Sequence, residues 1–305
     1  MMIDSIMQNN LISVVIPMFN REETIKECLN SVCNQTYKNI EILVVDDCSS
    51  DNSVHLVENY PDHRIRLIRI ENNSGAQMAR NKGIIEAKGE WIAFNDSDDI
   101  WDKTKLEKQV KILEQNNFDR KIVIHSNCYC YDQKNNNRWV WSVPKTEGFC
   151  FSLLLKRPAP LFPAILTSKV ALIEHGLLDE KVPSYQEWDT SLKLAKKCKF
   201  VHIDEPLFTY VIHQGQTISK DKKRDLEGFL YILNKYNSEM KKYGFYKYHI
   251  IFLTIRAIEF KLFDYARNII SLESGRGIKF FLLKILIRYK ISNKYVLKII
   301  RRIVR

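Results

Sequence analysis

The 305-residue sequence predicts an α/β fold: a Rossmann-like, mostly parallel sheet with helices on both faces, followed by a basic helical extension. Three observations predict it. Buried-strand patterns alternate with amphipathic-helix patterns over the first hundred residues. Of the four segments that directly follow these strands, where such sheets bind ligands, three are acidic or rich in hydrogen-bonding groups. From about residue 224 onward the pattern is helical and basic.

The N-terminal elements are predicted from short apolar runs and from helical spacing of apolar side chains. Leu11–Ile16 is an apolar run ended by Pro17, which indicates a buried strand. Arg21–Gln35 carries an apolar stripe typical of a helix packed on one face. The same reasoning predicts further strands at Ile40–Val45, Ile65–Ile70 and Trp91–Asn95, and helices at Ser49–Tyr60, with Ser49 or Ser50 as N-cap, and Ala76–Ala87.

The middle of the chain, from about 121 to 215, combines strand patterns, irregular segments and one helix. Three prolines between 158 and 163 indicate a loop. The expected strands are Ile122–Tyr131, Arg138–Val143, Phe200–Ile203 and Leu207–Ile212, and the expected helix is Trp188–Cys198.

Two acidic motifs follow predicted strands. Asp96-Ser97-Asp98 follows the strand WIAF, and two carboxylates one residue apart can share a divalent cation with a diphosphate. Such a cation stabilises the charge on a departing diphosphate. Asp46 and Asp47 end the strand EILVV, where a carboxylate can accept from a base or a ribose hydroxyl. The alternative in both places is a turn or a helix cap, which uses the same residue types.

Three further residues are candidates with structural alternatives. Glu187 lies at the start of a predicted helix and could accept a proton, although a first-turn Glu also favours a helix N-terminus. His213 could bind the metal or the diphosphate, or could be structural. Arg80, on the third helix, could contact phosphate or belong to a solvated helix face.

Three ordered segments, SVVIPMFNREETIKECLNSVCNQTYKNIEILVVDDCSSD, SGAQMARNKGIIEAKGEWIAFNDSDDIW and HGLLDEKVPSYQEWDTSLKLA, resemble family 2 glycosyltransferases of the GT-A fold. The resemblance covers roughly residues 11–215. We expect the nucleotide site to contain Arg80 and Ser97 together with the acidic motifs. The resemblance implies that the segment after the first strand, with Pro17, Phe19, Asn20 and Glu22, lies in the nucleotide pocket.

The resemblance also implies a metal-dependent reaction with inversion. The expected ligands of Mn²⁺ or Mg²⁺ are Asp98, as the direct ligand, together with Asp96 and His213. Glu187 falls where the family places its catalytic base, here within Gln-Glu-Trp where the family commonly has Glu-Asp-Trp. The expected donor is a nucleotide-diphosphate sugar, by default a UDP-sugar. The expected acceptor is a hydroxyl of a glycan or lipid-linked glycan, in cell-surface polysaccharide or glycolipid synthesis.

The domain division expected from these patterns places a GT-A catalytic domain at 1–220 and a helical basic region at 221–305. The catalytic domain would comprise a nucleotide-binding half at about 11–100 and an acceptor half at about 101–220. The seven cysteines are odd in number, scattered and without a Cys-x-x-Cys pair, as in proteins of the reducing cytosol. Neither a signal peptide nor an 18-residue apolar stretch is recognisable, so we expect a cytoplasmic protein.

The net charge of +11 comes from the end of the chain. Residues 276–305 contain ten Lys and Arg and no Asp or Glu, which leaves residues 1–275 at +1. Within Asn293–Arg305 the apolar residues share one helical face, as in helices that lie on anionic membranes. We therefore expect peripheral attachment to the inner face of the cell membrane through residues 276–305. The alternative is that these helices pack on the catalytic domain with basic outer faces.

Three other functions are alternatives. A nucleic-acid-binding or other basic polyanion-binding protein is suggested by the charge, but residues 1–275 are nearly neutral, so we expect no nucleic acid. A sugar nucleotidyltransferase would need a Gly-rich loop after the first strand, where this chain has Pro-Met-Phe-Asn. A catalytically inactive nucleotide-sugar-binding protein of the same fold is disfavoured by Asp96, Asp98 and Glu187.

Overall fold

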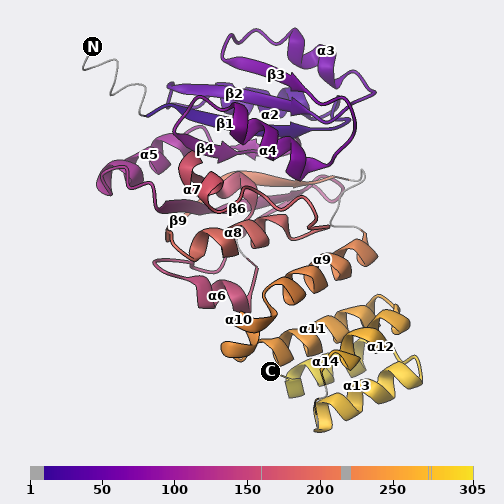
Figure 1. Cartoon of the computed structure of the whole chain (residues 1–305). Coiled ribbons are helices and arrows are strands. Elements are labelled where there is room, and N and C mark those ends of the chain that lie inside the picture. Colours follow the sequence, from indigo (N-terminus) through magenta and orange to yellow (C-terminus); the bar gives the residue numbers. More distant parts are fainter. Residues whose placement is uncertain (1–9, 159, 214–220, 274, 276, 305) are drawn as a thin grey trace. The chain divides into compact units, whose positions relative to one another are not determined.

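The computed structural model in Figure 1 describes residues 10–158, 160–213, 221–273, 275 and 277–304, with side chains up to residue 299. The chain forms two compact units. The first comprises Met1–Glu180 and Gln186–Gly215, and the second comprises Lys181–Tyr185 and Gln216–Arg305. The candidate residues named above all belong to the first unit.

The N-terminal part of the first unit alternates strands and helices as the sequence predicts, with shorter helices. The strands are β1 (Ile12–Met18), β2 (Ile40–Asp46), β3 (Ile65–Arg69) and β4 (Trp91–Phe94), and the helices are α2 (Ile25–Cys33), α3 (Ser53–Glu58) and α4 (Ala76–Glu86).

The strand order places a crossover next to β1. The nine strands of the described residues form one sheet with the order β3-β2-β1-β4-β8-β6-β9-β5, and β7 pairs with β6 beside this path. The chain runs outward from β1 to β3 and then returns to β4 on the other side of β1, all in parallel. Ligands of open α/β sheets bind where the strand order reverses in this way. The segments after β1, β2 and β4 therefore meet at one edge.

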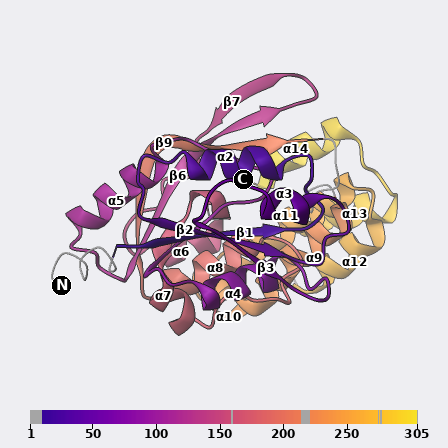
Figure 2. The ribbon, with the colours of Figure 1, turned by 90° about the horizontal axis from the view of Figure 1, so that it is seen from above.

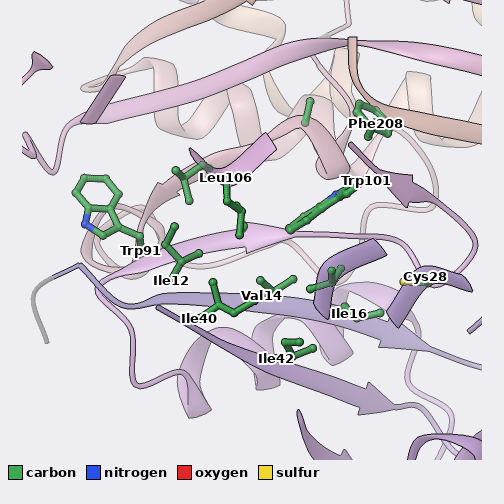
Figure 3. Packing of buried hydrophobic residues seen from close by; sticks show 14 of the residues in the cluster. Ile12, Val14, Ile16, Cys28, Ile40, Ile42, Trp91, Trp101, Leu106 and Phe208 are labelled. Carbon is green, nitrogen blue, oxygen red and sulfur yellow. The ribbon is translucent and has the colours of Figure 1, made fainter. Parts of the chain in front are cut away.

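Helices cover both faces of this sheet. Figure 2 shows α2 and α5 (Lys105–Gln115) on one side and α4 and α8 (Gln186–Ala195) on the other. Alternate residues of β1 point to the two sides: Val14 packs with the α2 side of the core, and Val15 lies against Gly83 of α4. Burial on both sides explains why these strands are continuous apolar runs. Figure 3 shows the core between the sheet and the α2 side.

Beyond β4 the sheet is mixed. Its strands are β5 (Ile100–Trp101), β6 (Ile122–Asp132), β7 (Asn137–Trp141), β8 (Leu166–Ser168) and β9 (Lys199–Ile212), accompanied by α6 (Phe151–Lys156), a short 3-10 helix (Phe162–Ala164) and α7 (Lys169–Glu174).

The expectation of two short strands at 200–203 and 207–212 is wrong. They form the single strand β9, which runs parallel to β6 and contains register shifts opposite Ser126–Tyr129. The bulge accommodates Glu205-Pro206, the polar pair that separates the two apolar runs in the sequence. The continuous strand carries His213, directly after its end, to the edge reached by β4.

The expected N-cap of α3 is also wrong. The helix begins at Ser53 with Asn52 at the capping position, and no side chain caps it. The hydroxyl of Ser49 instead accepts a hydrogen bond from the Asn20 backbone N–H. Similarly, α2 begins at Ile25 rather than near Arg21 because the segment after β1 is bound to the segment after β2.

The second unit is helical. It contains α9 (Lys222–Lys235), α10 (Asn237–Lys242), α11 (Tyr246–Glu259), α12 (Phe263–Ser271), α13 (Ile278–Arg288) and α14 (Lys294–Val304). Asp225 of α9 binds the guanidinium of Arg256 of α11 through both carboxylate oxygens, at 2.6 and 2.9 Å. Within the ranges that the structure describes, every helix is too short or too polar to traverse a bilayer.

Candidate active site

The segment after β1 is hydrogen-bonded to the segment after β2. The Asn20 side-chain oxygen accepts from the Ser50 backbone N–H at 2.8 Å, and a Glu22 carboxylate oxygen accepts from the Asn52 N–H at 3.0 Å. Asn20 has a φ of 51°, in the left-handed region that Asn tolerates better than most residues. Before it, Pro17 is buried within β1 and Phe19 is exposed at its end. Asn20 and Glu22 thus fix the shape of the expected nucleotide pocket.

Asp46 and Asp47 are both buried, and both accept hydrogen bonds from backbone amides. Asp46 accepts from the Ser49 N–H at 3.2 Å. Asp47 uses one oxygen for the Ser74 N–H at 2.8 Å and the other for the Gly75 N–H at 2.7 Å. Asp47 therefore fastens the start of α4 to the end of β2. The hydrogen bonds of both aspartates end on residues that precede the helices, so neither aspartate has the capping role that the sequence left open.

Asp96 is held by a buried arginine from α4. Arg80 is 5% exposed, and its guanidinium lies 2.5 Å from an Asp96 carboxylate oxygen. The same guanidinium donates to Gln77 at 3.0 Å and to Gln186, the first residue of α8, at 3.3 Å. It also lies over the ring of Phe162, 4.3 Å from the centroid. Arg80 is thus a fixed buried cation rather than part of a solvated helix face.

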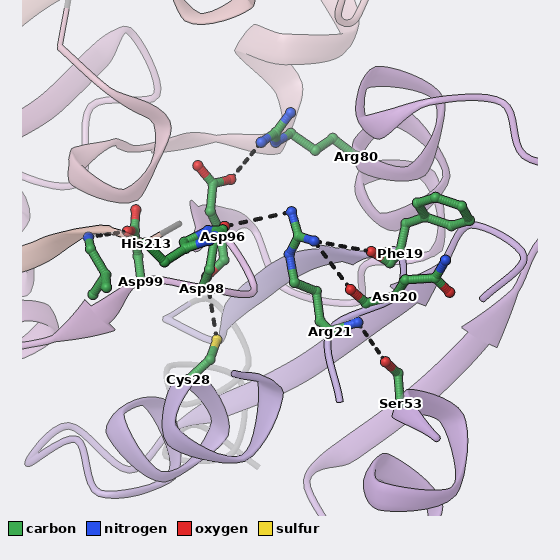
Figure 4. A network of polar contacts seen from close by, with 11 residues as sticks. Phe19, Asn20, Arg21, Cys28, Ser53, Arg80, Asp96, Asp98, Asp99 and His213 are labelled. Carbon is green, nitrogen blue, oxygen red and sulfur yellow. Dashed lines mark hydrogen bonds and ion pairs between the residues drawn. The ribbon is translucent and has the colours of Figure 1, made fainter. Parts of the chain in front are cut away.

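Asp98 and His213 meet although 115 residues separate them. One Asp98 oxygen lies 2.9 Å from the His213 Nε2, and the same oxygen lies 3.6 Å from the Arg21 guanidinium. Figure 4 shows Asp96, Asp98 and His213 side by side, with Arg80 and Arg21 on neighbouring segments. The extension of β9 brings the histidine to this position.

Glu187 belongs to the same cluster. It follows Gln186, which accepts from Arg80, and it lies close enough to Arg80 and Asp96 for both to affect its pKa. Burial raises the pKa of the Glu187 carboxyl above its usual value, and the negative charge of Asp96 raises it further. The positive charge of Arg80 acts in the opposite direction. A half-buried carboxyl with a raised pKa is a stronger base than an exposed carboxyl, which suits it to accept a proton.

Asp99 lies beneath this cluster. One of its carboxylate oxygens accepts from the Val211 N–H at 3.0 Å, two residues before His213. Burial is the main cause that raises the pKa of Asp99 well above its usual range, followed by the charges of Asp96 and Asp98. Asp99 is the residue after Asp98 in the chain, and its carboxylate binds the strand that ends just before His213. Asp99 therefore helps to hold Asp98 and His213 next to each other.

The donor set at Asp98 fits a divalent cation that takes further ligands from a substrate. No group of three His, Cys, Asp or Glu side chains among the described residues is arranged to hold a metal ion. A carboxylate and an imidazole do meet at Asp98 and His213, and Asp96 is directed to Arg80 instead. Mg²⁺-type sites commonly use one or two protein ligands together with phosphate oxygens and water. Two protein ligands beside an open edge meet that requirement.

The structure therefore brings together Arg80, Asp96, Asp98, Glu187 and His213 from four separate segments of the chain. Asp46 and Asp47 lie at the end of β2, which β1 separates from β4, and they accept hydrogen bonds from backbone amides. Ser97 is buried between the two aspartates of its motif. The roles expected for these residues stay predictions.

Sequence reasoning missed two contributors, Arg21 and Asp99. Arg21 directly follows Asn20 in the segment after β1. A cationic side chain in a segment expected to line the nucleotide pocket could have been predicted to lie near the diphosphate. Asp99 extends the acidic motif by one residue, but only the pairing of β5 and β9 shows what its carboxylate binds.

Comparison with known proteins agrees with this geometry. The model of the family described as Glycosyl transferase family 2 matches residues 13–176, more than half of the chain. An Escherichia coli relative, the UDP-Glc:alpha-D-GlcNAc-diphosphoundecaprenol beta-1,3-glucosyltransferase WfgD, is 40% identical over 49% of this chain and 57% of its own length. An uncharacterized glycosyltransferase of Rickettsia conorii is 30% identical over 88% of this chain and 45% of its own length.

The matched part of the chain corresponds to about half the length of these curated relatives. Among solved structures, residues 1–349 of Staphylococcus aureus TarS in complex with UDP-GlcNAc match with a TM-score of 0.58 and 21% identity, over 73% of this chain and 66% of that TarS fragment. That likeness confirms the predicted GT-A fold. With its sheet, its strand-end motifs and the family match over 13–176, the chain belongs to glycosyl transferase family 2.

Proposed function

We propose that this protein transfers a sugar from a nucleotide-diphosphate sugar to a hydroxyl group of an acceptor, with inversion at the anomeric carbon. One observation carries the proposal: Asp98 and His213 meet at the sheet edge where Arg80 joins Asp96 to the start of α8 and Glu187. The residues proposed to bind the leaving diphosphate and the residue proposed to accept the proton thus lie in one cluster. Membership of family 2 supports the same reaction class.

The donor is by default a UDP-sugar. The relative WfgD is named for UDP-Glc, and the TarS structure contains UDP-GlcNAc. In this chain the nucleoside would lie over the segment after β1, with Phe19 and the Asn20–Ser50 contact on one side and Asp46 at the end of β2. Arg21 would stand beside the diphosphate, since its guanidinium lies next to Asp98.

A divalent cation, Mn²⁺ or Mg²⁺, would be held by Asp98 and His213, with Asp96 near. When bound, such an ion neutralises the negative charge that develops on the departing diphosphate. Arg80 holds Asp96 in place through its 2.5 Å contact and keeps a positive charge buried beside the cluster. Asp99 keeps the two ligands together through its hydrogen bond to the strand that carries His213.

Glu187 would act as the general base. As the acceptor oxygen forms its bond to the anomeric carbon, the bond to the diphosphate oxygen breaks and the hydroxyl proton passes to the Glu187 carboxylate. This is a single displacement, so the configuration inverts and no covalent intermediate forms. The raised pKa of Glu187 makes it a stronger base than an ordinary carboxylate.

The names of two relatives support an acceptor class. WfgD is named for a diphosphoundecaprenol-linked GlcNAc acceptor, and the Bacillus subtilis relative TuaG, 42% identical over 34% of this chain and 42% of its own length, is named as a putative teichuronic acid biosynthesis glycosyltransferase. We infer that this chain acts on a glycan or lipid-linked glycan in cell-surface polysaccharide or glycolipid synthesis.

A screen of nucleotide sugars, measuring release of the nucleoside diphosphate with Mn²⁺ or Mg²⁺, tests the proposal. At least one donor should be hydrolysed or transferred, and Glu187→Gln should lower kcat by about 10²- to 10⁴-fold with little change in the binding of UDP. Glu23→Gln, at an exposed position of the same chain, is the matched control. NMR of the product should show the inverted anomer. Binding of UDP with no turnover of any donor would instead support the inactive nucleotide-sugar-binding protein.

A further inference from the structure

The last two helices of the second unit expose large apolar side chains. On α13, Ile278 and Phe281 are 68% and 62% exposed. On α14, Tyr295 and Ile299 are 78% and 58% exposed. Side chains of this size usually become buried, and a group of them on a surface marks a site of interaction.

Each of these helices already buries its other face within the second unit. Leu297 of α14 is 2% exposed, and at 100° per residue Tyr295 and Ile299 lie on the opposite side of the helix. On α13, Leu283 is fully buried, and Ile278 and Phe281 lie opposite to it. Packing within the unit therefore accounts for the inward residues and leaves an outer apolar face on both helices.

Lysines and arginines flank this outer face. Lys284 and Arg288 continue the exposed side of α13, and Lys294 and Lys298 are exposed on α14. In sequence, the ten basic residues from 276 to 305 have no acidic residue among them. Exposed apolar side chains together with exposed cations on the same two helices match the interface of an anionic membrane, where hydrocarbon lies below negatively charged headgroups.

We propose that α13 and α14 form a membrane-binding surface, made of Ile278, Phe281, Tyr295, Ile299 and the surrounding Lys and Arg residues, for a bilayer that contains anionic phospholipids. The aliphatic and aromatic side chains enter the boundary between headgroups and acyl chains, and the lysines reach the lipid phosphates with their long stems. A nucleic acid would satisfy the charges but would leave the aliphatic side chains exposed. The proposal goes beyond the proposed function and does not depend on it.

Co-sedimentation of the full chain with vesicles tests this surface. Vesicles of phosphatidylcholine with 30% phosphatidylglycerol should pellet the protein, and vesicles of phosphatidylcholine alone should not. Each Lys or Arg near an anionic surface strengthens binding about fivefold. The double variant Lys294→Gln/Lys298→Gln should therefore bind about 25-fold more weakly.

A second double variant tests the apolar part. Tyr295→Ser/Ile299→Ser should weaken binding at least about tenfold, because two apolar side chains no longer leave water. The matched controls are Val170→Ser/Ile173→Ser, which removes two exposed apolar side chains from α7, and Lys38→Gln/Lys111→Gln, which removes two exposed charges elsewhere. Both controls should pellet like the wild type. Nucleoside diphosphate release in solution should be the same for all four variants, which separates this test from that of the reaction.

Three results would overturn the proposal. The first is equal pelleting with and without phosphatidylglycerol, and the second is tail variants that pellet like their controls. The third is a wild-type protein that does not bind vesicles and instead shows one of two other interactions. It either forms a dimer that dissociates in the Tyr295→Ser/Ile299→Ser variant, or it binds a DNA oligonucleotide tightly. That result would assign the surface to a second copy of this chain or to a nucleic acid.

Discussion

Replacing Arg80 with methionine tests how the cluster is held. The variant keeps an unbranched apolar stem but lacks the guanidinium. It therefore removes the contact over the Phe162 ring, the charge beside Asp96 and the hydrogen bonds to Gln77 and Gln186. Removing one partner of a fully buried pair costs about 3–5 kcal/mol, whereas an exposed pair contributes about 1 kcal/mol or less. The Asp96 side chain is 31% exposed, so we expect a loss of about 2 kcal/mol.

Two assays read out this change. A loss of about 2 kcal/mol should lower the melting temperature by about 4–8 °C for a unit of this size. The pH profile of kcat should also move. Arg80 lowers the pKa of Glu187, so its removal raises that pKa, and more of the base is protonated at a given pH. The acid limb of the profile should therefore shift to higher pH.

Lys82→Met is the control on the same helix, because Lys82 forms an exposed ion pair with Glu86 at 2.9 Å. It should leave both the melting temperature and the acid limb unchanged. An Arg80→Met variant that melts like Lys82→Met, or whose acid limb stays in place or moves to lower pH, would refute the reasoning.

Three further substitutions have distinct expected outcomes. Asp47→Ala leaves two backbone N–H groups at the start of α4 without their acceptor and should lower the free energy of unfolding in urea by about 2–4 kcal/mol; an unchanged urea midpoint would contradict this. Gly83→Ala should destabilise by about 1–3 kcal/mol because the new methyl group meets Val15, although the same change stabilises an exposed helix. Asp99→Leu should raise the Kd for Mn²⁺ in the presence of UDP about 10- to 100-fold. Asp99→Asn can still accept from the Val211 N–H, so its Kd should be close to that of the wild type. Equal Kd values for the two variants would argue against a positioning role of Asp99.

The parallel half of the fold was predictable because each strand there is buried on both faces. Such strands are continuous apolar runs, as in β1 and β2, and the helices between them show regular spacing. The boundaries of α2 and α3 were less predictable. They depend on hydrogen bonds between Asn20, Glu22 and the segment after β2, which join residues about 30 positions apart.

The second half of the sheet was harder to predict because its strands pair over long distances. β9 continues through the polar pair Glu205-Pro206 because β6 runs beside it and pairs with it on both sides of the bulge. The two-residue strand β5 gives no signal of its own and exists through its pairing with Phe208 and Thr209.

The candidate site was predictable in composition but not in its contacts. The positions of Asp96, Asp98 and Glu187 could be inferred from strand ends and from the resemblance to the family. The sequence does not disclose that Arg80 holds Asp96, because salt bridges between α4 and the β4 end depend on the packing of α4 against the sheet. The same holds for Asp47, whose two oxygens are used at the start of α4.

The measurement that tests the central claim most directly is the affinity for Mn²⁺ with and without UDP, followed by electron paramagnetic resonance. If Asp98 and His213 hold a cation together with a diphosphate, Mn²⁺ should bind weakly alone and much more tightly with UDP. In the presence of UDP, Asp98→Asn should bind Mn²⁺ at least about tenfold more weakly than the wild type. Asp264→Asn, at a position 90% exposed, should bind Mn²⁺ as the wild type does. Equal Mn²⁺ binding by wild type and Asp98→Asn in the presence of UDP would contradict the account.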